Sequence, residues 1–202
     1  MIREAAVGNL REALLAEGRG AECVELCENL AEEGTTPSYG TIKMCRELLR
    51  IPIVVMIRPR GGDFVYDDAE FRVMLEDIRI CRELHVDGIS TGILRSDHTV
   101  DYERMRQIRE ACGGSLKVTF HKAIDETPDY EEAVRKLSAE GLIDRVLTSG
   151  QQETAVEGLE QIRRLQDIEG LEVVAAGRIT KENLPDLAAQ LRVTSFHGKK
   201  II

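Results

Sequence analysis

Acidic, basic and imidazole side chains recur where short apolar stretches of this sequence end. Glu25, Arg58, His121 and His197 each lie at or near the end of a stretch rich in Val, Ile, Thr or Cys. Carboxylate, imidazole and guanidinium groups together can exchange protons with a polar substrate and hold an anion. Ligands of parallel barrels bind at the carboxyl ends of the strands, so these positions indicate where a site lies before they indicate its reaction.

Four residues form the candidate catalytic set. In this hypothesis His121 is the general acid or base, Glu25 or Glu4 is its carboxylate partner, and Arg58 holds an anion; Asp125, four residues after His121, is the fourth candidate. A structural alternative stays open. Barrels often fill their interior with ion pairs, and Glu25 and Arg58, which belong to neighbouring predicted strands, could form one.

A second set of residues is predicted to bind the substrate. Gly177, and also Gly198 with Lys199, follow the last two predicted strands, where barrels often bind phosphate. The segment Arg60-Gly61-Gly62-Asp63 is equally consistent with a tight loop that needs glycine for backbone reasons. The predicted substrate-binding residues are Glu4, Arg60, Ser149, Gly177 and His197.

Soft metal chemistry is the other possibility. Soft metal ions prefer thiolate and thioether ligands, so Cys27 and Cys23 are candidate metal ligands, with Met56 as a thioether partner. On one strand the two cysteines would stand ~13 Å apart, whereas two thiolates on one ion lie within ~5 Å of each other. They can share an ion only if Cys27 already lies in the following loop. The alternative is that all five cysteines are small buried apolar residues with free thiols.

Eight β-type stretches would have to position these side chains. We predict strands over residues 2–7, 21–27, 53–58, 86–91, 116–121, 144–149, 172–176 and 193–197. Apolar residues at helical spacing fill most of the intervals, as in Phe71, Met74, Leu75 and Ile78. Strict alternation of strand and helix predicts an α/β fold, a TIM-type (β/α)8 barrel, formed by residues 1–202 as a single domain. Five residues follow His197, so we expect the barrel to lack its last helix.

Strand parity predicts which side chains point inward. The barrel face that meets the helices must be apolar, so residues of the opposite parity line the interior. Val24 and Leu26 face the helices, which turns Cys23, Glu25 and Cys27 inward. The same argument places Lys117, Thr119, His121, Ser195 and His197 inside, together with Glu4, Met56 and Arg58. The candidate groups are therefore expected to converge near one mouth of the barrel.

Composition limits the partners. The net charge of −9 disfavours nucleic acid, because an acidic surface repels phosphate backbones. No stretch approaches the ~20 apolar residues of a membrane span, and the amino terminus is not a signal sequence, so we expect a cytoplasmic protein with no membrane partner. The expected partner is a small molecule or a metal. A missing helix would expose apolar strand surface, which makes a homo-oligomer an open expectation.

Several segments resemble the signature blocks of the CutC copper homeostasis family. They are Glu25-Leu26-Cys27, Gly34-Thr35-Thr36-Pro37-Ser38, Met56-Ile57-Arg58-Pro59-Arg60-Gly61-Gly62-Asp63-Phe64, Thr119-Phe120-His121-Lys122-Ala123-Ile124-Asp125 and Leu147-Thr148-Ser149-Gly150. The resemblance implies a cytoplasmic TIM-type barrel that takes part in copper homeostasis and binds copper(I). The alternative is an enzyme that acts by acid–base chemistry on a small polar substrate, phosphorylated or glycosidic.

Overall fold

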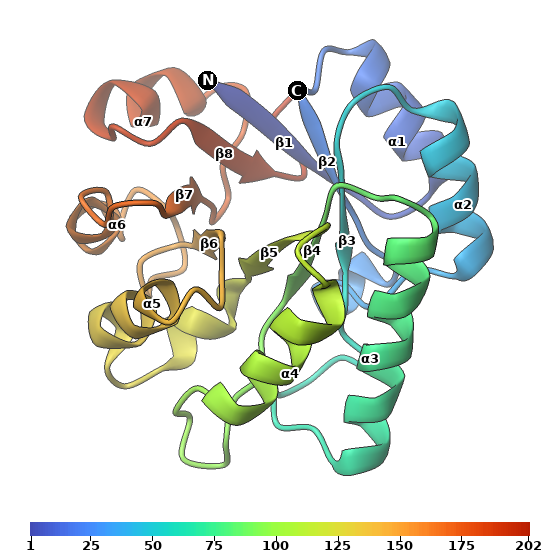
Figure 1. Ribbon diagram of the computed structural model, residues 1–202. Coiled ribbons are helices and arrows are strands. Elements are labelled where there is room, and N and C mark those ends of the chain that lie inside the picture. Colours follow the sequence, from blue (N-terminus) through green and yellow to red (C-terminus); the bar gives the residue numbers. More distant parts are fainter.

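Eight parallel strands close into a barrel in the computed structural model, which describes residues 1–202 (Figure 1). Neighbouring strands follow the order of the chain, and β1 pairs with β8, where Glu4 lies beside His197. The expected TIM-type (β/α)8 barrel is confirmed. The strands are β1 (Ile2–Val7), β2 (Cys23–Leu26), β3 (Ile53–Met56), β4 (Gly88–Thr91), β5 (Lys117–Phe120), β6 (Arg145–Thr148), β7 (Glu172–Ala175) and β8 (Ser195–Gly198).

Helices form a ring around these strands (Figure 1). They are α1 (Leu10–Gly18), α2 (Tyr39–Leu48), α3 (Asp68–Glu83), α4 (Tyr102–Cys112), α5 (Tyr130–Ala139), α6 (Leu159–Leu165) and α7 (Leu184–Gln190), with 3-10 turns η1 (Leu30–Glu32) and η2 (Lys122–Glu126). No helix follows β8, as expected, and both chain ends lie between α7 and α1 in this view. None of the helices is both long and apolar enough to cross a membrane.

Strands β2 to β8 begin or end one or two residues from the predicted limits, and only β1 matches its predicted range. Strand β3 ends at Met56, earlier than expected, because the backbone N–H and C=O of Arg58 bond to Thr36 in the loop after β2 and not to a neighbouring strand. Arg58 therefore lies in the loop after β3. Helix α7 begins at Leu184, after Asn183, and Thr180 forms a parallel β-bridge with Lys200. The bridge lays the residues after β8 against the loop after β7.

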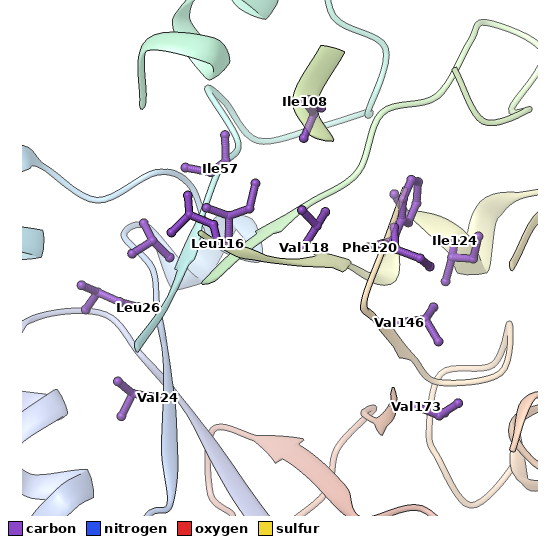
Figure 2. Packing of buried hydrophobic residues seen from close by; sticks show 14 of the residues in the cluster. Val24, Leu26, Ile57, Ile108, Leu116, Val118, Phe120, Ile124, Val146 and Val173 are labelled. Carbon is purple, nitrogen blue, oxygen red and sulfur yellow. The ribbon is translucent and has the colours of Figure 1, made fainter. Parts of the chain in front are cut away.

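The main hydrophobic core lies between the strands and the helices. Figure 2 shows Val24, Leu26, Val118, Phe120 and Val146 pointing outward from the barrel. On the other side of this layer, Phe71, Met74 and Ile78 form the buried stripe of α3, which starts with a capping box between Asp67 and Glu70. Because the apolar side chains of the strands are buried on the outer face of the barrel, the inward positions can be occupied by polar residues. The interior accordingly contains Glu4, Glu25, Ser90, Thr119, Arg145 and Ser195, all buried.

Apart from Ile2, which is 37% exposed, the apolar residues of the two strands next to the chain ends are covered within the chain. Ala5 and Val7 of β1 are each 3% exposed, and Phe196 of β8 is 1% exposed. The absence of an eighth helix therefore does not leave these side chains in water. Exposed strand surface was the ground for expecting a homo-oligomer, so that expectation loses its argument, and the oligomeric state stays a prediction.

Candidate functional site

A cavity of about 650 Å³ opens at the carboxyl ends of the strands. That volume suits a small organic molecule. Most of the strands and their following loops contribute to its lining, which includes Glu25, Met56, Arg58, His121, Gly177 and His197. Five of the residues proposed from the sequence as catalytic or substrate-binding therefore line one cavity. Met56, the proposed thioether ligand, lines it as well.

Glu25 and His197 form a buried pair at the floor of this cavity. The Nε2 atom of His197 lies 2.8 Å from Oε2 of Glu25. Burial works against the charged form of each group, but mutual attraction outweighs it: the pKa of Glu25 falls to about 2 and the pKa of His197 rises above its ordinary value. A carboxylate–imidazolium pair results. The Nδ1 atom of His197 makes no hydrogen bond within the protein, so it is free to meet a ligand.

His121 lies in the same cavity, but its ring is neutral. Burial, followed by the nearby Arg58 guanidinium, lowers its pKa to about 4, so the ring is neutral at pH 7. The backbone N–H of Ala123 donates to Nδ1 at 3.2 Å, which places the ring proton on Nε2. That Nε2–H is buried and has no acceptor. His121 is thus a hydrogen-bond donor toward the cavity rather than a ready base.

The space for the His121 ring depends on Gly92, a residue that sequence reasoning did not single out. A Cβ atom at Gly92 would lie 2.6 Å from Cε1 of His121 and 2.8 Å from Cβ of Ala123. Real Cβ contacts do not come so close, so any larger residue would displace the ring. No sequence signal could identify this glycine, because the contact joins two strands whose ends are close only in the barrel.

Arg58 is already engaged by the loops around it. Its Nη1 donates to the carbonyls of Glu32 at 2.7 Å and Gly34 at 3.1 Å, and its Nη2 donates to the carbonyl of Gly62 at 2.6 Å. The guanidinium also stacks over Phe64, 4.8 Å from the ring centroid. Only Nε remains buried without a partner. Arg58 therefore fastens two loops and retains one N–H for a ligand, and it forms no ion pair with Glu25.

Deeper in the barrel lies a second charged group that sequence reasoning missed. Arg145 of β6 contacts Glu4 at 2.6 Å and Glu172 at 3.3 Å. The alternation of Arg145 with outward-facing Val146 was the available signal for its inward direction. Ligand atoms of Glu4, Glu25 and His197 lie within 4.8 Å of one another, a separation that a metal ion could bridge. The guanidinium of Arg145 opposes a cation there, because it already neutralises Glu4.

Four of the proposed catalytic and substrate-binding residues lie outside the cavity lining: Glu4, which pairs with Arg145, and Asp125, Ser149 and Arg60. Asp125 accepts hydrogen bonds from the backbone N–H groups of Ser149 and Gln151, both at 2.9 Å, and from the Ser149 hydroxyl at 3.0 Å. It shapes the loop after β6, together with Ser149. Arg60 pairs with Glu70 at 2.6 Å and with Asp63 at 3.0 Å, which orders the loop before α3. The structure gives these residues architectural contacts.

The two candidate copper ligands lie at different ends of the barrel interior. Cys23 lines a separate cavity of about 590 Å³ at the amino ends of the strands. Cys27 directly follows β2, and its Sγ lies 3.7 Å from Oε2 of Glu25. A Cβ atom built on Gly34 would lie 3.3 Å from Sγ of Cys27 and 3.6 Å from Cε of Met56, so these two sulfur residues are neighbours. Burial raises the pKa of both thiols, which are protonated at pH 7.

Comparison with known proteins points to one family. The model of the CutC family matches residues 1–202. A CutC family protein of Chromobacterium violaceum is 41% identical over 199 residues, which cover 98% of this chain and 80% of that protein. The human copper homeostasis protein cutC homolog is 40% identical over 198 residues, covering 97% of this chain and 72% of that protein.

Solved structures agree with this relationship. A CutC crystal structure from Streptococcus agalactiae superposes with a TM-score of 0.94 at 37% identity, covering all of both chains. Phosphoenolpyruvate phosphomutase of Streptomyces platensis superposes with a TM-score of 0.65 at 14% identity, covering 98% of this chain and 75% of that one. The second likeness shows the barrel fold alone.

Proposed function

The chain belongs to the CutC family, and we propose that the mouth of its barrel binds a small polar organic molecule and performs acid–base chemistry on it. One observation carries the proposal. Oε1 of Glu25, Nε of Arg58 and Nε2 of His121 are buried without hydrogen-bond partners, and all three residues line the same cavity. Each such group costs about 1–3 kcal/mol when unsatisfied, and a bound polar ligand would recover that free energy.

The imidazoles of His197 and His121 have different roles in the proposed acid–base chemistry. Glu25 orients His197 through Nε2 and favours its protonated form, so Nδ1 of His197 is the group that gives a proton to the ligand or takes one back. His121 supplies a neutral Nε2–H to an oxygen that gains negative charge, without itself changing protonation state. Two titratable groups whose environments separate their pKa values are the usual arrangement for assigning distinct acid–base roles.

A thermal-shift screen of small polar metabolites tests this proposal. Ligands of the mouth are expected to raise the melting temperature of the parent but not of His121→Ala or His197→Ala. His98→Ala is the matched control, since His98 is exposed and lies outside the cavity lining. Identical responses from all four proteins would mean that the mouth is not the binding site.

Copper(I) binding is the second candidate. The human relative is named a copper homeostasis protein, and the specific support here is the adjacency of the Cys27 thiol and the Met56 side chain. Both offer soft ligands that suit copper(I). Because the pKa of Cys27 is raised by burial and then by Glu25, binding would have to release the thiol proton.

Competition for copper(I) against a colorimetric chelator tests this candidate. Cys27→Ser is expected to lose binding, whereas Cys45→Ser, which changes a thiol buried in α2, is expected to keep it. Full stoichiometry and affinity in Cys27→Ser would remove the site. We also propose a cytoplasmic location, because all five cysteines are free thiols, as is usual in a reducing compartment. Cell fractionation checks the location.

A further inference from the structure

The mouth of the barrel is basic although the whole chain is acidic. Five lysines and arginines and three glutamates line the cavity, whereas the chain as a whole carries a net charge of −9. The basic lining residues are Arg58, Lys122, Arg178, Lys199 and Lys200. A cavity whose lining carries an excess of one charge concentrates ions of the other sign, so this mouth attracts anions.

The three lysines among these basic residues have no ion pair: Lys122, which follows β5, and Lys199 and Lys200, which follow β8. Arg178 pairs with Glu153, and Arg58 is held by loop carbonyls. Lys199 makes one hydrogen bond, to the carbonyl of Leu30 at 2.9 Å, which leaves its charge without an acidic partner. Lys200 has no hydrogen bond or ion pair through its side chain. Two ammonium groups after β8 therefore lie at one side of the cavity outside any ion pair of the protein.

Backbone donors of the preceding loop lie in the same region. The N–H groups of Gly177, Arg178 and Ile179 donate to no acceptor within the protein. All three residues line the cavity, and Gly177 and Arg178 have positive φ values of 105° and 53°. Ile179 is only 1% exposed, so its N–H is the hardest of the three for bulk water to satisfy. Consecutive free N–H groups are the usual backbone contribution to an anion site.

Two glycines have no side chain and so allow close contacts at these loops. A Cβ atom at Gly198 would lie 2.2 Å from the carbonyl oxygen of Ile179, and one at Gly177 would lie 2.7 Å from Cβ of Ser149. The bridge between Thr180 and Lys200 holds the same two segments side by side. The donors are therefore fixed in place before any ligand arrives, which lowers the entropic cost of binding.

We propose that the loops after β7 and β8 form a phosphate-binding subsite, composed of the Gly177–Ile179 N–H groups with Lys199 and Lys200, and that the substrate of the mouth is a phosphate monoester. The identification of this molecule as a substrate rests on the function proposed above. His197 precedes Lys199 by two residues, so a phosphate held here leaves the remainder of the molecule beside the Glu25–His197 pair. The cavity of about 650 Å³ has room for both parts.

Titration with inorganic phosphate at low ionic strength, followed by amide NMR and calorimetry, tests the subsite. The N–H signals of Gly177, Arg178 and Ile179 are expected to shift most. Lys200→Ala is expected to weaken phosphate binding about ten-fold, and Lys199→Ala/Lys200→Ala further, because each removes a charge-assisted contact. Lys181→Ala is the matched control: this exposed lysine lies outside the cavity lining, and its removal is expected to leave the affinity unchanged.

These experiments distinguish an incorrect phosphate subsite from an incorrect acid–base function. No saturable phosphate binding, or equal affinity in the Lys181 and Lys200 variants, overturns the subsite. The amide signals are read from the folded parent protein, so they decide the matter even where a variant is unstable. Phosphate binding that persists in His197→Gln supports the subsite, whereas the acid–base proposal depends on the separate loss of metabolite responses in the His121 and His197 variants.

Discussion

Two histidines in one cavity have pKa values shifted in opposite directions, because their nearest charged neighbours differ. Arg58 faces His121, whereas Glu25 contacts His197. Both rings are buried, which alone would favour the neutral form. A cation beside one ring and a carboxylate beside the other separate the two pKa values, so a single fold supplies a neutral donor and a charged acid within one site.

The first prediction concerns pH. The pKa of His121 is lowered from 6.5 to about 4, so its neutral form stabilises the fold fully above pH 6.5 and that stabilisation is lost as the pH falls toward 4. The loss is on the order of 3 kcal/mol. Urea unfolding of the parent across this range is expected to show it, and His121→Gln is expected to show a flatter profile. Equal slopes in the two proteins would contradict the assignment.

The second prediction concerns Gly92. Gly92→Ala is expected to destabilise the protein by about 1–3 kcal/mol and to abolish ligand responses at the mouth, since the new methyl group must displace the His121 ring. Gly18→Ala is the matched control, because a Cβ atom there has no neighbour within 4 Å. Urea unfolding compares the two. A neutral Gly92→Ala would show that the ring has room to move.

At the scale of elements, strand parity carried most of the information in the sequence. Val24 and Leu26 face outward, which leaves Glu25 inside, and the same alternation brings His197 to the cavity. Loop contacts could not be predicted in this way. Arg58 binds three carbonyls from two loops, and Arg60 turns away to Glu70, because irregular backbone has no periodicity from which to read a direction.

Arg145 joins β6 to β1 and β7 inside the barrel, and a third prediction follows. Arg145→Met is expected to destabilise the protein by about 3–5 kcal/mol, because Glu4 would remain buried without its counter-ion. Arg106→Met, which removes an exposed ion pair with Glu140, is the control and is expected to change little. Denaturant unfolding measures both.

At the scale of the molecule, charged groups form a continuous series along the barrel axis. Glu25 and His197 line the mouth, Glu4 lies within reach of both, and Arg145 connects Glu4 to Glu172 at the amino-end cavity. The outer apolar layer surrounds this series and keeps it from water. Strong electrostatic coupling along the axis is the expected result, because charges interact over longer distances where water is excluded.

The fourth prediction tests that coupling. Glu4 helps to raise the pKa of His197 but does not act on His121, so Glu4→Gln is expected to lower the pKa of His197 and leave that of His121 unchanged. NMR titration of the imidazole Cε1 protons measures both. Glu22→Gln, which neutralises a more exposed acid paired with Arg3, is expected to change neither. Parallel shifts of both histidines would point to a general change of structure instead.

This axial series makes the two openings of the barrel communicate. A proton or cation that entered at the base, beside Glu172 and Arg145, would alter the ionisation of the histidine at the top without any movement of the backbone. An ion bound at the lower opening is therefore expected to shift the pKa of His197 through charge alone.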